Sequence, residues 1–336
     1  MGRCIKVPLK DGENIRRKLK EDGLLDRTRS VVVEGDHLLI PVEGNIEGYE
    51  TLERDLPPLN CRETNYRRMV DVPGELVGLL PTSYDLIGDL AVIKLDERLL
   101  PYAEELAEAI MKANPRLRSV ALDHGVKGEM RVRDLEILRG ENKTATLHTE
   151  FGVTMEVDPS LVYFNPRLAN ERKRVADMVL EGELIADMFA GVGPFPLVIC
   201  RHARPRRIYA IDINPEAVRI MERNIRRNKF QEIIVPILGD AREEMRSLPP
   251  LDRIIMNLPQ MADEFLDSAL SALKVGGVIH LYRILERDAL EGFQDSLVSR
   301  AASWGFIISL ETVRELKTYS PTMSVYSFDV KLIALG

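Results

Sequence analysis

Cysteine and histidine are scarce in this chain of 336 residues. Its three cysteines, Cys4, Cys61 and Cys200, form no Cys-x-x-Cys pair, and its five histidines show no spacing typical of metal ligands. We therefore expect neither a disulfide framework nor a metal site. Long apolar runs are also missing, and the start from Met1 to Cys4 lacks the apolar core of a signal peptide. These absences predict a cytoplasmic protein with no membrane partner.

An excess of basic residues is missing too. The chain has 46 Lys and Arg residues against 53 Asp and Glu residues, which gives a formal net charge of −7. This balance argues against a nucleic-acid partner, because neutralisation of phosphates drives such binding. The local charge differs, since residues 161–230 hold thirteen basic and eight acidic residues. A basic face fits an RNA-binding surface, but solvated helix faces would give the same count, so both interpretations stay open.

The central motif of the chain, at residues 184–196, lacks the third glycine of the dinucleotide-binding fingerprint. The apolar run from Leu184 to Ala186 is followed by Asp187 and then by Gly191 and Gly193. This pattern predicts a strand, a tight turn and a helix start, where backbone N–H groups can meet a nucleotide-like ligand. The dinucleotide fingerprint would need a further glycine where the chain has Pro196, and this weakens the case for a nicotinamide oxidoreductase.

Acids or amides follow three more apolar runs. Asp212 ends the run 208–211, 25 residues after Asp187, Asp240 follows 233–238, and Asn257 follows 253–256. In a parallel sheet these side chains would share the carboxyl edge, where open α/β folds bind ligands, and Asp212 would be placed to accept ribose hydroxyls. Further strands are predicted at 276–282, 306–313 and 324–333, the last two as an antiparallel pair. The fold class is therefore α/β.

Two smaller α+β regions are predicted before this sheet. Residues 1–56 show a strand at 3–9, a basic helix at 13–21 and a hairpin of 31–33 with 38–42, and Pro57-Pro58 indicates a stiff linker. Residues 57–161 show a strand at 90–95, a helix at 99–113 and a hairpin of 145–148 with 153–157. The third domain is then 162–336. Whether the first module is a folding appendage or a recognition arm is open from the residues alone.

Two stretches carry candidate catalytic side chains. Arg131 and Arg133, two residues apart, would share one face of an extended segment, although paired arginines are often only surface charge. Tyr163 and Phe164 precede a proline-bounded turn and a helix that begins with Glu171 beside arginines. Aromatic rings stack on nucleobases and a carboxylate can accept a ring proton, so this stretch suits a base-handling site; the alternative is a linker with a capped helix.

Together these motifs resemble the archaeal and eukaryotic tRNA (guanine-N1)-methyltransferases that modify position 37, next to the anticodon. The resemblance rests on Gly128 to Arg133, Tyr163 to Arg172, Asp187 to Phe195, Tyr209 to Pro215 and Asn257 to Pro259, in this order. It implies a class I, Rossmann-like domain with a mostly parallel seven-stranded sheet, S-adenosylmethionine as cofactor and tRNA as partner. It implies no protein partner.

The resemblance also implies roles for individual residues. Glu171 would be the general base for the N1 proton, Arg131 would stabilise charge on O6, and Tyr163, Asn257 and Pro259 would hold the guanine. The cofactor would be bound by Asp187, Phe189, Gly191, Gly193, Asp212, Ile213, Asp240, Ala241 and Asn257, and the RNA by Arg133, Arg167, Arg172 and Arg174. The amino-terminal module would reach the outer corner of the tRNA. Related wyosine-pathway tRNA enzymes, which methylate a tricyclic base or transfer an aminocarboxypropyl group, and a catalytically silent tRNA-binding module are the alternatives.

Overall fold

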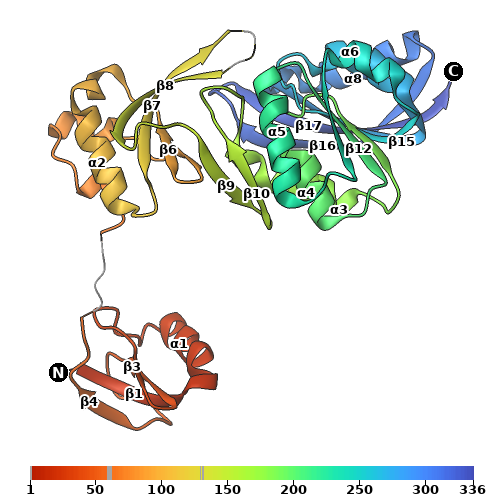
Figure 1. The fold of residues 1–336 in the computed structure, drawn as a ribbon. Helices are drawn as coiled ribbons and strands as arrows, with labels where there is room; N and C mark the ends of the chain where they lie inside the picture. The colour runs from red at the N-terminus through yellow and green to blue at the C-terminus, as the bar shows by residue number, and fades with distance from the viewer. Residues whose placement is uncertain (1, 59–62, 129, 131) are drawn as a thin grey trace. The chain divides into compact units, whose positions relative to one another are not determined.

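The computed structural model describes residues 2–58, 63–128, 130 and 132–336. The chain forms two compact units, Met1–Met69 and Val70–Gly336 (Figure 1). Among the described residues, no helix has the length and apolar character needed to cross a membrane.

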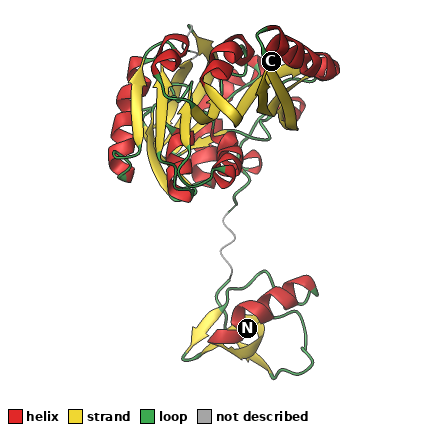
Figure 2. Cartoon of the chain, turned by 90° about the vertical axis from the view of Figure 1, so that its right-hand side faces the viewer, coloured by secondary structure: helices red, strands yellow, loops and turns green. Residues whose placement is uncertain are grey.

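The first unit is a four-stranded antiparallel sheet with one helix beside it (Figure 2). Alternation along β1 gives the sheet two apolar faces, because Ile5 points into the core with Leu19 of α1 while Cys4 packs with Leu39 and Leu56 on the other face. Leu56 is 2% exposed, so the chain up to the double proline packs in this unit. The strand order is β2-β3-β1-β4, with β1 Gly2–Pro8, β2 Val32–Glu34, β3 His37–Pro41, β4 Thr51–Arg54 and α1 Gly12–Glu21.

The second unit begins with a smaller mixed sheet. The helix expected at 99–113 starts later, at Ala103, because Pro101 has no N–H to donate and the chain before it forms a 3₁₀ turn from Glu97 to Tyr102. The strand order is β5-β6-β7-β8, with β5 Asp85–Ile87, β6 Leu90–Ile93, β7 Ser119–Lys127, β8 Val132–Gly140 and α2 Ala103–Ala113.

A hairpin, β9 Thr146–Glu150 and β10 Val153–Val157, follows this sheet and packs on the large sheet's layer of helices. Val153, Met155 and Val157 are fully buried in the core that α3, α4 and α5 share. Asn224 of α5 fixes the hairpin's register, because its Oδ1 accepts from the backbone N–H of Glu156 at 2.6 Å. The hairpin is thus part of the large sheet's core, although the boundary predicted after residue 161 placed it in the middle domain.

The large sheet has seven strands in the order β13-β12-β11-β14-β15-β17-β16. The first five in that order are parallel, and β17 is antiparallel to both of its neighbours. This confirms the predicted α/β fold. The strands are β11 Leu184–Asp187, β12 Arg207–Asp212, β13 Ile234–Leu238, β14 Leu251–Met256, β15 Leu273–Glu286, β16 Phe306–Thr318 and β17 Met323–Leu335.

Helices cover both faces of the large sheet because its strands are apolar on both sides. In β11, Ile185 enters the core under α3, α4 and α5, while Ala186 enters the core under α6, α7 and α8. The chain order reverses at β11, which lies between β12 and β14, and such a switch point is where ligands bind. The helices are α3 Ala169–Met178, α4 Pro194–His202, α5 Pro215–Asn228, α6 Ala241–Glu244, α7 Leu266–Ala272 and α8 Leu290–Ser303.

Candidate active site

A cavity of ≈ 670 Å³ lies at the switch point, at the carboxyl ends of β11, β12, β13 and β14. The predicted site residues on its wall are Tyr163, Arg172, Phe189, Gly191, Asp212, Ile213, Asp240, Ala241, Asn257 and Pro259. Strand ends from four segments that are far apart in sequence therefore meet at one site.

Asp187 lies beneath this cavity at the end of β11 and is 0% exposed. One carboxylate oxygen accepts from the backbone N–H of Phe189 at 3.2 Å, and the other, Oδ2, has no hydrogen-bond partner in the described part of the chain. Burial raises the pKa of Asp187 to about 8, and the negative charge of Asp212 adds to that shift. A buried acceptor without a donor is costly, so this side chain is suited to a cationic or N–H-bearing ligand.

The glycine loop between β11 and α4 is held by the neighbouring strand. Gly191 and Gly193 have φ of 55° and 86°, a region that other residues rarely adopt, and a Cβ on Gly193 would lie 3.1 Å from Cγ of Met221. Asp212 accepts from the N–H groups of Gly191 at 2.6 Å and Asn214 at 2.8 Å. Burial raises the pKa of Asp212 although both bonds oppose it. Asp212 therefore fixes the loop as well as facing the cavity.

Apolar surface fills the other end of the cavity. Ile213 is 56% exposed on its wall, and Phe189 meets Phe265 edge to face with 4.9 Å between ring centroids. Asp240 caps α6 by accepting from the N–H of Arg242 at 2.8 Å. A large exposed aliphatic side chain beside an acid suits a flat, hydrogen-bonding ring such as a nucleobase.

The remaining wall comes from the stretch before α3 and from the loop after β14. Tyr163 is 38% exposed and lines the cavity with Asn257 and Pro259. The loop is anchored, because the carbonyl of Pro259 accepts from the N–H of Ile284 at 2.7 Å. An exposed ring in the same cavity as an amide and an anchored loop can hold a second planar ligand.

Glu171 lies behind this wall and is 6% exposed. Its two carboxylate oxygens accept from Arg174 at 2.7 and 2.8 Å, and the Tyr282 hydroxyl donates to Oε1 at 2.9 Å. Arg174 also binds Asp329 at 2.7 and 3.0 Å. Sequence reasoning missed Tyr282 and Asp329, since neither belongs to a motif and both are more than a hundred positions from Glu171.

The arginines expected to contact RNA differ in their surroundings. Arg172 is 1% exposed, so it is not available as a surface phosphate contact; its guanidinium binds Glu150 at 2.5 and 2.7 Å. Arg174 is bound as described, and Arg133 pairs with Asp85 at 2.8 Å. Arg167 also pairs with Asp85 but keeps 52% of its side chain exposed. Arg131 lies outside the described residues.

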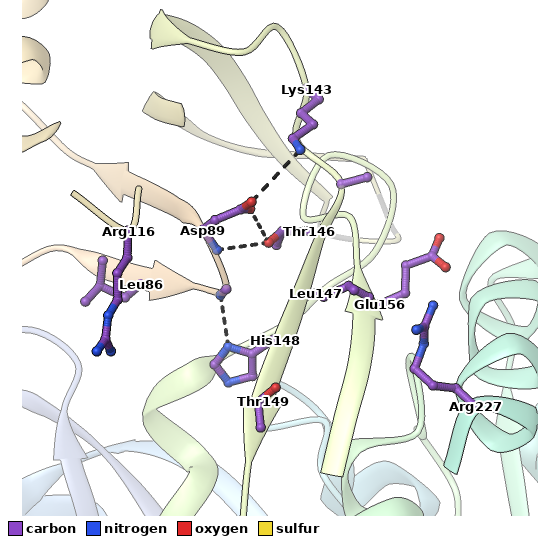
Figure 3. A pocket seen from close by; sticks show the side chains of 12 residues that line it. Leu86, Asp89, Arg116, Lys143, Thr146, Leu147, His148, Thr149, Glu156 and Arg227 are labelled. Atoms are coloured by element: carbon purple, nitrogen blue, oxygen red, sulfur yellow. Dashed lines mark hydrogen bonds and ion pairs between the residues drawn. The ribbon is translucent and has the colours of Figure 1, made fainter. Parts of the chain in front are cut away.

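A second cavity, of ≈ 730 Å³, shares no lining residue with the first (Figure 3). It marks the seam between the β5–β6 turn and β9. Thr146 donates to Asp89 at 2.6 Å, and Gly88 N–H donates to Nδ1 of His148 at 3.1 Å. These polar groups hydrogen-bond to one another and join the β5–β6 turn to β9, so their role at this cavity is structural.

Family models match most of the chain. They are described as the TRM5/TYW2 methyltransferase domain over residues 146–300, the TYW2 N-terminal domain over 67–144 and the tRNA methyltransferase 5 N-terminal domain over 4–50. The first model begins at the start of β9, which agrees with the packing of the hairpin on the large sheet.

Relatives match over nearly the whole length. The tRNA (guanine(37)-N(1))-methyltransferase Trm5b of Pyrococcus abyssi is 42% identical over 332 residues, 98% of each chain. Its crystal structure aligns with a TM-score of 0.78 over 99% of this chain and 100% of that one at 41% identity.

Two further solved structures contain ligands. A complex of aTrm5 and tRNALeu aligns with a TM-score of 0.71 at 33% identity, over 98% of this chain and 99% of that one. The TYW2 of Methanocaldococcus jannaschii, solved with AdoMet, aligns with a TM-score of 0.59 at 26% identity, over 75% of this chain and 100% of that one. The resemblance expected from the motifs is confirmed: the chain belongs to the TRM5/TYW2 methyltransferase family.

Proposed function

We propose that this protein transfers the methyl group of S-adenosylmethionine to N1 of guanine at position 37 of tRNA. The observation that carries the proposal is the cavity at the switch point, which Asp212, Asp240 and Asn257 line from three strand ends, with the buried Asp187 at the end of a fourth. Family membership and the near full-length similarity to Trm5b support the same activity.

The cofactor fits the residues of the cavity. The unpartnered Oδ2 of Asp187 would provide an acceptor for the ammonium of the methionine part, and Gly191 of the glycine loop lines the cavity beside it. Asp212 would accept the ribose hydroxyls, and Asp240, Ala241 and Ile213 would surround the adenine. When bound, the cofactor supplies an electrophilic methyl group, so the protein's main task is to orient the guanine for in-line displacement.

Guanine would be held between Tyr163 and the Asn257 to Pro259 loop. Tyr163 offers an exposed ring for stacking, and the anchored loop offers the Asn257 amide as a hydrogen-bonding group. The target base must leave its stack to reach them, which costs a few kcal/mol and least in a loop. An anticodon-loop substrate meets this requirement.

Glu171 would accept the N1 proton while Arg131 stabilises the charge that grows on O6. A carboxylate base of this kind typically raises the rate of the chemical step by about 10²- to 10⁴-fold. Glu171 is 6% exposed and is not among the residues that line the cavity, so this role requires its carboxylate to become accessible when RNA binds. Tyr282 and Arg174 hold the carboxylate in one orientation until then.

The direct test is mass spectrometry of an unmodified tRNA transcript after incubation with the protein and isotope-labelled S-adenosylmethionine. We expect one labelled methyl on N1 of guanine 37. A transcript with guanine 37 replaced by adenosine is the control and should stay unlabelled. Transfer of an aminocarboxypropyl group, or labelling only of a tricyclic base, would assign the protein to the wyosine-pathway relatives instead, and no transfer at all would leave a tRNA-binding protein.

A variant tests the proposed base. Glu171→Gln keeps the size of the side chain but cannot accept a proton, and it puts an NH2 group in place of one of the two oxygens that accept from Arg174. Single-turnover transfer should fall by about two orders of magnitude while cofactor affinity stays near wild type. Folded Glu171→Gln protein that transfers methyl at the wild-type rate would remove Glu171 from the mechanism.

A further inference from the structure

A buried polar network connects the proposed base on α3 to β15 and β17, on the face of the sheet that α3 covers. Glu171 is on α3, Tyr282 on β15 and Asp329 on β17, and the last two are 0% and 2% exposed. Arg174 donates to both carboxylates, of Glu171 and of Asp329, so one guanidinium is shared by two acids.

The network continues through His280, whose protonation can be assigned from its partners. Nη1 of Arg253 lies 2.8 Å from Nε2 of His280, and an arginine only donates, so Nε2 accepts. The proton of the neutral ring is then on Nδ1, which donates to Asp329 at 2.6 Å. Burial lowers the pKa of His280, in agreement with a neutral ring. Arg253 is paired with Glu183 at 2.8 Å.

The charges around Glu171 follow from this assignment. His280 is neutral and Arg253 is compensated by Glu183, so the one cation beside Glu171 in the described network, Arg174, faces two carboxylates. Burial acts against the charge of Asp329, but bonds from His280 and Arg174 outweigh it and hold its pKa well below the usual range. Asp329 thus stays ionised whatever the state of Glu171.

We propose that Asp329 and Tyr282 are positioning residues for proton transfer to Glu171, with Asp329 as the counter-charge that keeps Arg174 compensated when Glu171 is neutralised. This inference rests on the proposed function. In the step, the N1–H bond of guanine breaks, its proton joins a Glu171 oxygen, and its electron pair forms the bond to the methyl carbon. The methyl–sulfur bond breaks at the same time, and its electron pair stays on sulfur, which leaves as a neutral thioether. If Glu171 were the only partner of Arg174, its protonation would leave a largely buried cation, 18% exposed, without a counter-charge, which is unfavourable.

Asp329 makes protonation of Glu171 easier, whereas Tyr282 makes it harder. Its hydroxyl donates to Oε1, and such a bond favours the ionised carboxylate. The hydroxyl does not give up its own proton, because burial and the charge of Glu171 raise the pKa of Tyr282 well above its ordinary value. It therefore orients the carboxylate as a donor only.

The alternative is that the network only ties α3 to β15 and β17. Both roles predict lower stability when a member is removed, so stability alone does not separate them. The pH dependence of the chemical step does, since only groups that act through Glu171 should move it, and the two removals should move it in opposite directions.

The experiment measures single-turnover methyl transfer to the unmodified transcript from about pH 5 to 9, with the full chain and saturating cofactor. Asp329→Asn keeps the shape of the side chain but removes the negative charge that competes with Glu171 for Arg174, so Arg174 favours ionised Glu171 more. The rise of the rate on the acidic side of the pH profile (the acidic limb) should then move to lower pH by about one unit. Tyr282→Phe removes a donor to the carboxylate, so the limb should move to higher pH by a similar amount.

Matched controls lie in the same sheet. Asp252 of β14 pairs with Lys274 at 2.6 Å, and Tyr326 of β17 packs with Phe328 in the core under α6, α7 and α8. Asp252→Asn and Tyr326→Phe make the same chemical changes outside the bonds to Glu171, and both should keep the wild-type profile. Opposite shifts in the two test variants support the inference. Unchanged limbs, shifts in one direction, or equal shifts in the controls overturn it.

Two further outcomes are separable. If Asp329→Asn does not fold by circular dichroism, Tyr282→Phe, which keeps every charge, decides: a shift to higher pH supports the inference and an unchanged limb overturns it. A wild-type protein that does not methylate the transcript would refute the proposed function, whereas a wild type that methylates with the two variant profiles unchanged would refute only this inference.

Discussion

Replacing Asp187 by asparagine should stabilise the ligand-free protein at neutral and alkaline pH. Burial raises the pKa of this carboxyl from 3.8 to about 8. The folded state therefore holds a proton that the unfolded state has lost between these values, and stability falls as pH rises from about 4 to about 8. Asparagine does not titrate, so the variant should escape this loss.

The size of the effect follows from the linkage. Each pH unit is worth about 1.4 kcal/mol, so from about pH 5 to about pH 8 the wild type should lose about 4 kcal/mol relative to Asp187→Asn. The asparagine keeps the acceptor for the Phe189 N–H, but its buried amide lacks a partner at a cost of about 1–3 kcal/mol. The net gain at about pH 8 is then about 1–3 kcal/mol, or roughly 2–4 °C in melting temperature per kcal/mol.

The free energy of unfolding of both proteins is measured without cofactor, by thermal and urea denaturation at several pH values above about 5. Carboxyls whose pKa is lowered, such as Asp85 and Glu150, are ionised throughout this window in both proteins. A second set of melts with S-adenosylmethionine should show stabilisation of the wild type and little of the variant. Parallel loss of stability with pH in the two proteins would refute the assignment of the buried, unpartnered carboxyl.

Three other perturbations follow from the structure. Asp212→Ala should weaken S-adenosylmethionine binding by about 1.5–3 kcal/mol for each charged hydrogen bond lost, and calorimetry that finds unchanged affinity would contradict its ribose role. Arg172→Met removes the bidentate partner of the buried Glu150 carboxylate and leaves it with His148, whose Nε2 lies 3.6 Å from Oε2, so denaturation should show a loss of up to about 3–5 kcal/mol, partly recovered in a double variant with Glu150→Met; a loss below about 1 kcal/mol would mean that the pair is not buried in solution. The fragment 70–336 should keep a cooperative melt and cofactor binding but bind tRNA more weakly by filter assay, and full tRNA affinity would exclude a recognition role for the first unit.

The large sheet could be predicted because its signals are local. Apolar runs ending in Asp187, Asp212 and Asn257 mark strand ends, and parallel strands bring those ends to one edge. The cavity wall was predictable for the same reason. The site residues themselves follow from the motif, and their catalytic roles stay predictions.

The surroundings of the charged side chains could not be predicted. Charge counting treats Arg172 as a surface cation, but its partner Glu150 is on a hairpin 22 positions earlier and both are buried. Glu171 meets Tyr282 across 111 positions. Such pairs depend on how α3 packs against β9 and β15, which no local pattern records. The packing of Leu56 against Cys4 and Leu39 also depends on distant strands that no local pattern indicates.

The pair of Arg172 and Glu150 has a consequence for dividing this enzyme into parts. A fragment that starts after residue 161 would retain the arginine on α3 and discard its carboxylate together with three buried side chains of β10. Such a fragment would expose an apolar face and leave a cation without its counter-ion, so it should aggregate rather than fold. A minimal catalytic fragment must therefore begin before Thr146, and swaps between relatives should move the hairpin and the large sheet together.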